Sequence, residues 1–412
     1  MNHVHTGQYS SRTASRHHRR GCAAVWWQRT QLPGVALLLS ALAGCGIFGG
    51  DEIDPNAPAE LVEFESSTQL KRVWRTSVGA GAGDVPLYNA PVYNAGKVYI
   101  ADRKGEIYVV AADSGRVENR IESKLRISAG PEVSGGLILV GTVDGEVFAF
   151  SSDDGEVRWR APVSSEVLSK PILHDGVVVV RCIDGRIFGF DAITGVRRWL
   201  YDRNVPLLTL RGNSPPLARG GVIYVGYDGG EVIALRAGDG TLIWEQPVST
   251  REGKTDLERL ADIDGPMAIV ASDLYVTSSK GRLAALSLQS GRIQWVKDTG
   301  SAKGLAVART RLALADSSSQ VWLVDRINSA TLWKQDKLFN RDVTRPAFYL
   351  NYTVVGDSKG YLHLIDTESG EFAARDRLDS DGISRAPLVV GTDMFIYTDA
   401  GNLYLYRAGA AI

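Results

Sequence analysis

The stretch that decides the fold runs from Pro131 to Trp159 and reads PEVSGGLILVGTVDGEVFAFSSDDGEVRW. Short runs of Val, Ile, Leu and Phe alternate in it with turn sequences such as Asp144-Gly145. β-Branched and aromatic residues at alternating positions favour a pleated strand, and Asp-Gly tolerates the positive φ of a tight hairpin turn. The stretch therefore predicts a small antiparallel sheet of four strands.

The same pattern recurs along the chain in eight copies that share four registers. The turn residue Gly145 has counterparts at Gly105, Gly185, Gly230, Gly281, Ser319, Gly360 and Gly401. Ten residues further on, a second turn residue stands at Gly115, Gly155, Gly195, Gly240, Gly291, Ser329 and Gly370. Fourteen residues after the first turn stand Asn119, Trp159, Trp199, Trp244, Trp295, Trp333 and Ala374. Near fourteen residues before it stand Pro91, Pro131, Pro171, Pro216, Pro266, Leu305, Pro346 and Pro387.

A period near 40 residues with four strands per copy is typical of a β-propeller. We therefore expect an all-β fold, an eight-bladed β-propeller of four-stranded antiparallel blades, because neighbouring sheets around a ring bury each other's faces. The Pro register suits the entry of each innermost strand. The recurring indoles are expected to pack between adjacent blades rather than to stack on a ligand. They are Trp74, Trp159, Trp199, Trp244, Trp295 and Trp333.

The eighth copy ends near Tyr406 and has no room for its fourth strand. The segment Leu70–Val78 lies at the other end of the repeats and carries Trp74, which the last copy otherwise lacks. We therefore expect the N-terminal strand to complete the C-terminal blade. Such pairing hides two sheet edges and closes the ring.

Composition and charge exclude several classes of function. Of the 412 residues, 44% are hydrophobic and 23% are charged, as in ordinary globular proteins. Residues 1–44 carry five Arg and no acidic residue, which leaves 41 basic against 47 acidic residues in the rest. This excess of acid argues against a nucleic-acid surface. Beyond residue 45 the only His are His174 and His363 and the only Cys is Cys182, so we predict no metal site, no cofactor and no disulfide.

The N-terminal region has the pattern of a secretory signal. A basic segment precedes the apolar run 35–44, which is too short to span a membrane as a helix. The run ends in Leu42-Ala43-Gly44-Cys45, which resembles the bacterial lipobox and implies cleavage before Cys45 and lipidation of its thiol. Gly46, in place of an Asp, implies sorting to the outer membrane. We therefore expect a signal peptide at 1–44, a lipidated, flexible tether at 45–60 and a single propeller at 61–412.

The spacing of the repeats is broken twice. The first turns are 38–41 residues apart, except that Gly185 to Gly230 is 45 and Gly230 to Gly281 is 51. Both expansions fall in connections from the outer strand of one blade to the inner strand of the next, at 200–214 and 248–265, on one face of the ring. Long loops on a rigid scaffold are where function concentrates.

Each expanded loop has a composition that suits binding. The first contains Leu208-Thr-Leu210-Arg211, which is unusually apolar for a surface loop and includes an Arg, a favoured interface residue. The second contains Leu260-Ala-Asp262-Ile-Asp264, which could present carboxylates for charged hydrogen bonds to a partner. The alternative is that the leucines fold inward and that the two Asp only cap turns. The residues alone do not decide between these interpretations.

The lipobox, the tether, the Trp repeats and these two loops together resemble the BamB family, lipoproteins of the outer-membrane β-barrel assembly machinery. The resemblance covers residues 45–412. It implies a non-catalytic scaffold at the periplasmic face of the outer membrane of a Gram-negative bacterium. It also implies that Leu208, Leu210, Arg211, Asp262 and Asp264 contact the periplasmic POTRA domains of the barrel subunit BamA. Further implied partners are the other Bam lipoproteins and unfolded outer-membrane proteins, which exposed outer strands could receive by β-augmentation.

Two other functions fit parts of the pattern. Quinone-dependent alcohol dehydrogenases are propellers with similar Trp repeats, but they use a Ca²⁺ site and an adjacent Cys pair. Beyond Cys45 this chain has only Cys182, so it cannot form the pair, and its acidic residues stand mainly at turn positions such as Asp144, Asp184 and Asp228. No Gly-x-Ser-x-Gly motif occurs either, so we predict no catalytic residue and no enzyme activity. A generic periplasmic propeller that binds peptide or glycan remains open.

Overall fold

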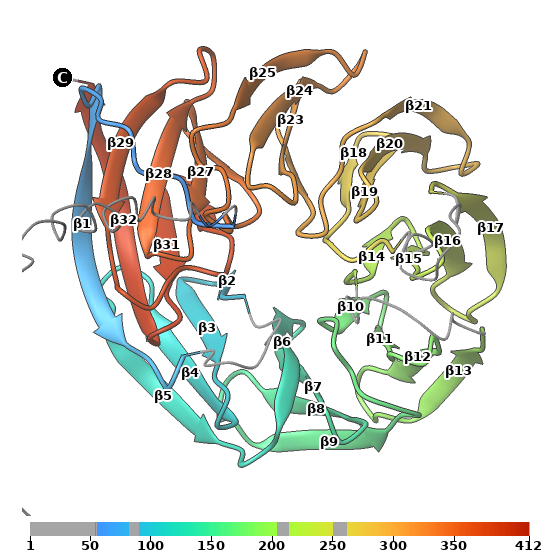
Figure 1. The fold of residues 1–412 in the computed structure, drawn as a ribbon. Coiled ribbons are helices and arrows are strands. Elements are labelled where there is room, and N and C mark those ends of the chain that lie inside the picture. The colour runs from blue at the N-terminus through green and yellow to red at the C-terminus, as the bar shows by residue number, and fades with distance from the viewer. Residues whose placement is uncertain (1–53, 55, 82–89, 204–213, 250–261, 412) are drawn as a thin grey trace, which may run out of the picture. The chain divides into compact units, whose positions relative to one another are not determined.

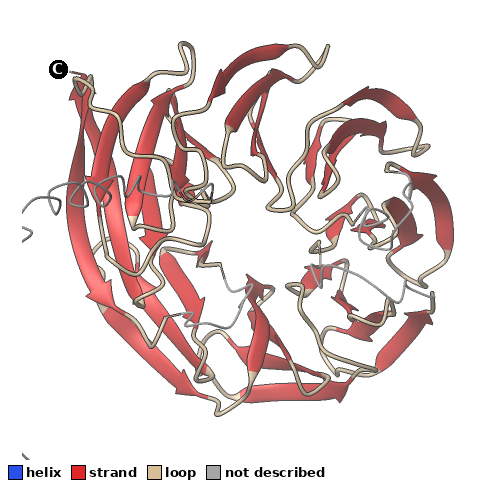
Figure 2. Ribbon diagram, viewed as in Figure 1, coloured by secondary structure: helices blue, strands red, loops and turns tan. Residues whose placement is uncertain are grey.

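The computed structural model describes residues 54, 56–81, 90–203, 214–249 and 262–411. Within these ranges the chain has no helix and forms eight four-stranded antiparallel sheets (Figure 2). No helix that could cross a membrane is found in the same ranges. The predicted all-β, eight-bladed propeller is confirmed.

Each blade is an antiparallel sheet whose strands follow the chain from the inner edge to the outer edge, except that β1 forms the outer edge of blade 8. Blades 1 to 3 consist of β2 (Val92–Asn94), β3 (Lys97–Ala101), β4 (Glu106–Ala111), β5 (Val117–Glu122), β6 (Ile127–Ser134), β7 (Leu137–Thr142), β8 (Glu146–Ser151), β9 (Val157–Pro162), β10 (Ile172–His174), β11 (Val177–Arg181), β12 (Ile187–Asp191) and β13 (Arg197–Tyr201). Blades 4 and 5 consist of β14 (Leu217–Arg219), β15 (Val222–Gly226), β16 (Glu231–Arg236), β17 (Leu242–Pro247), β18 (Ala268–Val270), β19 (Asp273–Ser278), β20 (Arg282–Ser287) and β21 (Ile293–Lys297). Blades 6 and 7 consist of β22 (Leu305–Val307), β23 (Arg311–Ala315), β24 (Val321–Asp325), β25 (Thr331–Gln335), β26 (Ala347–Tyr349), β27 (Tyr352–Gly356), β28 (Tyr361–Asp366) and β29 (Phe372–Arg377). Blade 8 consists of β30 (Leu388–Val390), β31 (Asp393–Tyr397), β32 (Asn402–Ala411) and β1 (Thr68–Ser77).

The hydrophobic core lies between the blades rather than within them. The blades follow one another around a ring from the cyan β2–β5 to the red β30–β32 (Figure 1), and β2 contacts both β6 and β30. One core cluster combines Leu139 and Ala149 of blade 2 with Val178 and Phe190 of blade 3. Burial of apolar surface between neighbouring sheets is the main favourable contribution to folding, so each blade is stabilised by the next.

The turn registers have the backbone conformation that the sequence predicts. All eight first-turn positions have positive φ, from 65° at Ser319 to 88° at Gly185 and Gly281. Residues with a Cβ rarely adopt this conformation, which is why glycine fills seven of the eight positions. The Pro register differs in one blade, because Pro131 lies inside β6 rather than at its start. The ladder between β6 and β7 is irregular between Ala129 and Glu132, so no regular hydrogen bond is lost there.

The tryptophans of the outer strands lie in the seams between blades. Their indole Nε1 atoms donate to backbone oxygens of the next blade over 2.9–3.2 Å: Trp74 to Ala112, Trp159 to Ala192, Trp199 to Ala237, Trp244 to Leu288, Trp295 to Arg326 and Trp333 to Thr367. The second-turn glycine of the next blade makes room for the ring. A Cβ at Gly195 would lie 2.7 Å from the Trp159 indole. The indole therefore both fills the seam and hydrogen-bonds across it.

The ring closes as the sequence predicts. Strand β1 pairs antiparallel with β32, and Trp74 lies opposite Leu405. Trp74 and Phe395 of blade 8 share one core cluster with Val98 and Tyr108 of blade 1. The first and last described strands are thus joined in one sheet, and that sheet packs on the first blade.

The segment before β1 runs along blade 7 without regular secondary structure. The amide of Ala59 donates to the Phe339 oxygen over 2.9 Å, and Arg341 Nη1 donates to the Ala59 oxygen over 2.8 Å. Arg375 Nη1 donates to the Val62 oxygen over 2.9 Å. These contacts hold the chain on the propeller from about residue 59 onward.

Candidate functional site

The two expanded connections lie on either side of blade 4. Leu208, Leu210 and Arg211 of the first connection lie outside the described residues, as does the predicted lipidation site Cys45. Asp262 and Asp264 of the second connection are described, in the segment that leads to β18. Both side chains are buried, with 0% and 8% of their residue surface exposed.

Ile263 fixes the segment that carries the two acids. Its side chain is fully buried, and its amide donates to the Tyr227 oxygen over 3.2 Å. A Cβ at Gly226, the last residue of β15, would lie only 2.4 Å from Ile263 Cγ2. The absence of a side chain at Gly226 therefore lets the segment pack tightly on blade 4. With Ile263 inserted, the acids on either side of it are held against the same blade.

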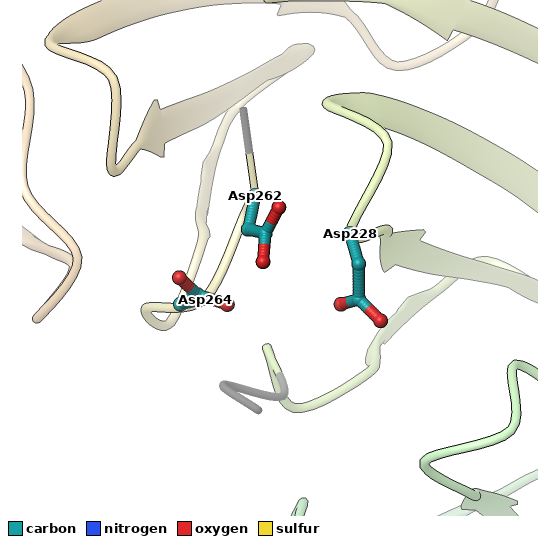
Figure 3. Close-up of side chains that lie close together, drawn as sticks. All are labelled: Asp228, Asp262 and Asp264. Carbon is teal, nitrogen blue, oxygen red and sulfur yellow. The ribbon is translucent and has the colours of Figure 1, made fainter. Parts of the chain in front are cut away.

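Three carboxylates from two segments gather there. Asp262 and Asp264 come from the segment before β18, and Asp228 follows β15 (Figure 3). One oxygen of each lies within 4.8 Å of the others, and all three residues are buried. In the described part of the chain, neither carboxylate oxygen of Asp264 has a hydrogen-bond partner. Like charges this close in a buried place repel each other, so the cluster needs positive charge.

Arg181, at the end of β11 in blade 3, brings that charge. Its side chain is fully buried, and Nη2 donates to Asp228 Oδ1 over 2.8 Å. Nη1 points to the Ser214 oxygen at 3.4 Å, and the guanidinium lies 5.1 Å from the centre of the Tyr227 ring. Arg181 thus links blade 3, blade 4 and Ser214 at the end of the first expanded connection.

The described ends of both expanded connections meet on one turn of blade 4, residues 227–231. Arg203, near the start of the first connection, lies 5.0 Å from the Tyr227 ring and forms ion pairs with Glu231 and Glu245. Ser249 stands at the start of the second connection, and its amide donates to the Gly230 oxygen over 3.1 Å. Because both connections contact this turn at their described ends, those ends are held at fixed positions relative to each other.

Known proteins place the chain in a family. A family model described as outer membrane protein assembly factor BamB matches residues 103–335. The outer membrane protein assembly factor BamB of Pseudomonas aeruginosa is 44% identical over 384 residues, which cover 93% of this chain and 99% of that protein. The chain belongs to the BamB family. Among solved structures, BamB from Moraxella catarrhalis has 24% identity and a TM-score of 0.75, and it covers 82% of this chain and 100% of that one.

The dehydrogenase likeness is one of fold alone. Quinohemoprotein alcohol dehydrogenase from Comamonas testosteroni is 12% identical, with a TM-score of 0.65 over 82% of this chain and 76% of that enzyme. The propeller fold is common to both.

The negative charge of the acid cluster in this BamB-family chain is partly balanced by Arg181, a residue of the same chain. Three carboxylate oxygens at this spacing have the chemistry of a site for a hard cation such as Ca²⁺. The guanidinium of Arg181 already donates a hydrogen bond to one of these oxygens, Asp228 Oδ1. Its positive charge would repel a metal ion bound beside it. Arg181 therefore supplies, from within the chain, the positive charge that a metal ion would otherwise bring to the cluster.

Burial, together with the negative charges of the nearby Asp262 and Asp228, raises the pKa of Asp264 to about 7, although the positive charge of Arg181 acts to lower it. The folded-state pKa thus exceeds the unfolded value near 3.8, so the native state binds more protons between these limits. Asp264 contributes to stability fully below about pH 4, and this contribution is lost as the pH rises through about 7.

Asp264→Asn should therefore raise the melting temperature at pH 8, where the wild-type carboxylate is ionised and buried. The expected gain is on the order of 2–4 kcal/mol in the free energy of unfolding. The gain should shrink toward pH 5, where the native carboxyl is protonated. Thermal melts between pH 5 and pH 8 measure it, with Asp113→Asn, at an exposed turn, as the matched control. A wild-type protein that melts above the variant at pH 8 would contradict the raised pKa.

Sequence reasoning missed Arg181, Tyr227 and Asp228, although the repeat held a signal for the first. Arg181 stands four residues before its turn glycine, where the other copies have Ala101, Gly141, Gly226, Thr277, Ala315, Gly356 and Tyr397. A buried Arg where five of the other copies have Ala or Gly marks a special position. Asp228 stands two residues before the turn glycine Gly230, a position that suggests only a turn, but its carboxylate binds Arg181 of the neighbouring blade. Sequence also predicted that Asp262 and Asp264 present carboxylates to a partner; in the structure of this chain they are buried instead.

Proposed function

We propose that this chain is a non-catalytic scaffold lipoprotein of the outer-membrane β-barrel assembly machinery, and that its two expanded connections dock on the barrel subunit BamA. Leu208, Leu210 and Arg211 would form the apolar and cationic part of the docking surface, and the buried Asp262 and Asp264 would hold the second connection in place beneath it. The BamB relatives are named as assembly factors, which supports the role in assembly.

The observation that carries the docking proposal is the convergence of the two connections on the turn 227–231. Arg203 and Ser249 leave from this turn, and Ser214 and Asp262 return to the Arg181 cluster beside it. A rigid base lowers the entropy that a loop loses when it binds, so loops fixed at both ends bind more tightly than free ones.

Attachment to the membrane is the second part of the proposal. Cleavage before Cys45 and acylation of its thiol would hold the propeller at the periplasmic face of the outer membrane. Contact with the other Bam lipoproteins would follow from membership of the same assembly. Unfolded outer-membrane proteins would meet the propeller there as substrates. Mass spectrometry of the mature protein tests the anchor, since an N-terminal peptide that begins at an unmodified residue would contradict it.

Binding of the purified propeller to the periplasmic domains of BamA tests the docking surface. Leu210→Ala and Arg211→Ala should each weaken binding by about tenfold or more, because interface leucines and arginines in desolvated positions carry much of the binding energy. Their melting temperatures should equal that of the wild type. Biolayer interferometry and thermal melts measure the two quantities.

Leu332→Ala is the matched control, because Leu332 is a leucine of β25 in blade 6 with 47% of its surface exposed. It should leave the binding constant unchanged. If Leu210→Ala and Arg211→Ala bind as tightly as Leu332→Ala, the docking surface lies elsewhere. Quinone-dependent dye reduction by the purified protein would contradict the non-catalytic part of the proposal.

A further inference from the structure

The segment before β1 is fastened to blade 7 by two arginines of the propeller. We name residues 59–67 the strap. Arg341 Nη1 donates to the Ala59 oxygen over 2.8 Å, and Arg375 Nη1 donates to the Val62 oxygen over 2.9 Å. Both arginines bind backbone oxygens, so the main chain of the strap is held at two points that are three residues apart.

Arg375 also contacts a side chain of the strap. Its guanidinium lies 4.9 Å from the centre of the Phe64 ring and 4.9 Å from the centre of the Phe372 ring in β29. The two rings are 5.4 Å apart, and Leu61 and Phe64 pack against the core cluster that includes Phe372. A hydrogen bond and two cation–π contacts thus meet at one guanidinium, so the hold on the strap depends on where that guanidinium lies.

A fully buried pair of residues sets the positions of both arginines. Asp357 and His363 are 0% exposed. Asp357 Oδ2 accepts a hydrogen bond from Arg341 Nε over 2.7 Å and lies 3.0 Å from His363 Nε2. Arg375 Nε donates to His363 Nδ1 over 3.1 Å. Because arginine can only donate, Nδ1 is the acceptor, and the single proton of the neutral ring lies on Nε2 and is donated to Asp357. His363 therefore holds Arg375 only in its neutral form.

The charges around His363 disfavour a second proton on its ring. Asp357 contributes one negative charge, and Arg341 and Arg375 contribute two positive charges. A further titratable group is Tyr361 of the same strand, whose ring centre lies 6.2 Å from that of His363. Burial, together with the positive charges of the two arginines, lowers the pKa of His363 below its ordinary value of 6.5, although Asp357 acts to raise it. The second proton can bind only at Nδ1, where it would face the Nε–H of Arg375 and break that hydrogen bond.

We propose that the strap is an acid-released latch, in which a proton on His363 Nδ1 displaces Arg375 and so frees the middle of the strap from blade 7. Arg375 can turn toward solvent, because its bond to Val62 lies at the protein surface. The bond of Arg341 to Ala59 does not involve the histidine ring, so release begins at Val62.

The latch opens as the pH falls. In the latched state the pKa of His363 lies below 6.5, and departure of Arg375 moves it back toward that value, because a positive charge leaves the ring. The released state therefore binds more protons than the latched state. The hold on the strap is complete above about pH 6.5 and weakens as the pH falls below it.

The latch also sets how far the propeller can move from a membrane to which Cys45 is attached. Ala59 stands 14 residues after Cys45, and Thr68, the first residue of β1, stands 23 residues after it. At about 3.4 Å per extended residue, the longest reach is about 48 Å with the strap held and about 78 Å with the strap released. This consequence rests on the lipid anchor proposed above, whereas the latch itself does not.

Cleavage by a Glu-specific protease tests the latch, because the strap contains Glu60, Glu63 and Glu65. The purified protein is compared with a synthetic peptide of residues 56–68, which gives the cleavage rate of the free sequence at each pH. The protein should be cleaved more slowly than the peptide at pH 7.5, and this protection should fall about tenfold at Glu63 and Glu65 by pH 5.5. Protection at Glu60, next to the bond that Arg341 retains, should fall less. Protection that is the same at both pH values would overturn the proposal.

Two histidine variants identify the titrating group. His363→Gln removes the titration but keeps an amide that can donate to Asp357, so protection of its strap should not change with pH. His174→Gln is the control: His174 lies in blade 3, accepts a hydrogen bond from the Gly221 amide, and its loss should leave the pH dependence as in the wild type. Asp264 cannot cause the effect, because its pKa is raised and its protonation favours the folded state. Wild-type pH dependence in His363→Gln would refute the latch.

A second pair of variants keeps the latch testable even if His363→Gln does not fold. Arg375→Gln should show weak protection at Glu63 already at pH 7.5 and should lose little more at pH 5.5. Arg377→Gln is the matched control, two residues along β29, with its guanidinium 5.3 Å from the Tyr361 ring, and it should behave as the wild type. Equal protection in these two variants would show that Arg375 does not hold the strap. The assay does not require acylation, so failure of the latch is distinct from failure of the proposed anchor, which mass spectrometry tests.

Discussion

Arg181→Ala is expected to lower the free energy of unfolding by about 3–5 kcal/mol, because it leaves buried carboxylates without their cation. The side chain is fully buried, and its guanidinium holds Asp228 Oδ1 at 2.8 Å beside Asp262 and Asp264. Urea unfolding followed by circular dichroism measures the loss. We also expect weaker binding to BamA domains at temperatures where the variant is still folded, since Arg181 supports the end of the first expanded connection.

Two further variants separate the buried charge from the loss of a large side chain. Arg181→Met with Asp228→Leu removes the pair together and should recover much of the lost stability, because a buried ion pair contributes little beyond an apolar pair of similar size. Arg186→Ala removes an exposed Arg that pairs with Asp184 and Asp202, and should cost less than about 1 kcal/mol. A loss below 1 kcal/mol for Arg181→Ala itself would show that the carboxylates do not need the guanidinium.

Trp199→Ala is expected to cost about 3–5 kcal/mol, the range for removing a large buried aromatic side chain. The indole is 7% exposed, fills the seam between blades 3 and 4 and donates to the Ala237 oxygen over 2.9 Å. A Cβ at Gly240 would lie 2.7 Å from the ring, so no other side chain can enter from that turn. The void therefore stays, and urea unfolding should detect its cost.

The neighbouring residue supplies the control for this seam. Leu200→Ala, one residue along β13 and 42% exposed, should cost less than about 1 kcal/mol. Trp199→Phe should fall between the two, because it keeps an aromatic ring but loses the hydrogen bond to Ala237. If Trp199→Ala and Leu200→Ala are equally stable, the seam does not depend on the indole.

The fold could be predicted from sequence because its determinants are local and repeated. A turn such as Asp144-Gly145 needs only its own residues to form, and eight copies in one register remove the ambiguity of any single copy. The pairing of β1 with β32 was predictable for the same reason. The last repeat lacks its outer strand, and the segment before the first repeat supplies an additional strand. Pro131 lies inside its strand instead of before it, because the ladder between β6 and β7 is irregular at that point. The spacing of residues in the sequence does not reveal this irregularity.

The candidate site was only partly predictable because its contacts join distant positions. Spacing alone located the expanded connections, since an insertion is visible in a regular repeat. The pairing of Arg181 with Asp228 spans 47 residues and two blades, so it depends on how blades pack rather than on any motif. The burial of Asp262 and Asp264 likewise follows from Ile263, whose side chain enters the space left by Gly226.

The pairing of β1 with β32 also sets the order in which the molecule can be completed. Strand β1 is synthesised before all the others but can pair only after β32 has been synthesised, because Thr68 pairs with Ala411 and Ser77 with Asn402. Contacts of such long sequence separation form late, since the chain must first lose the entropy of the whole intervening loop. A product truncated before Asn402 therefore cannot close the ring, and its open sheet edges can pair with other chains.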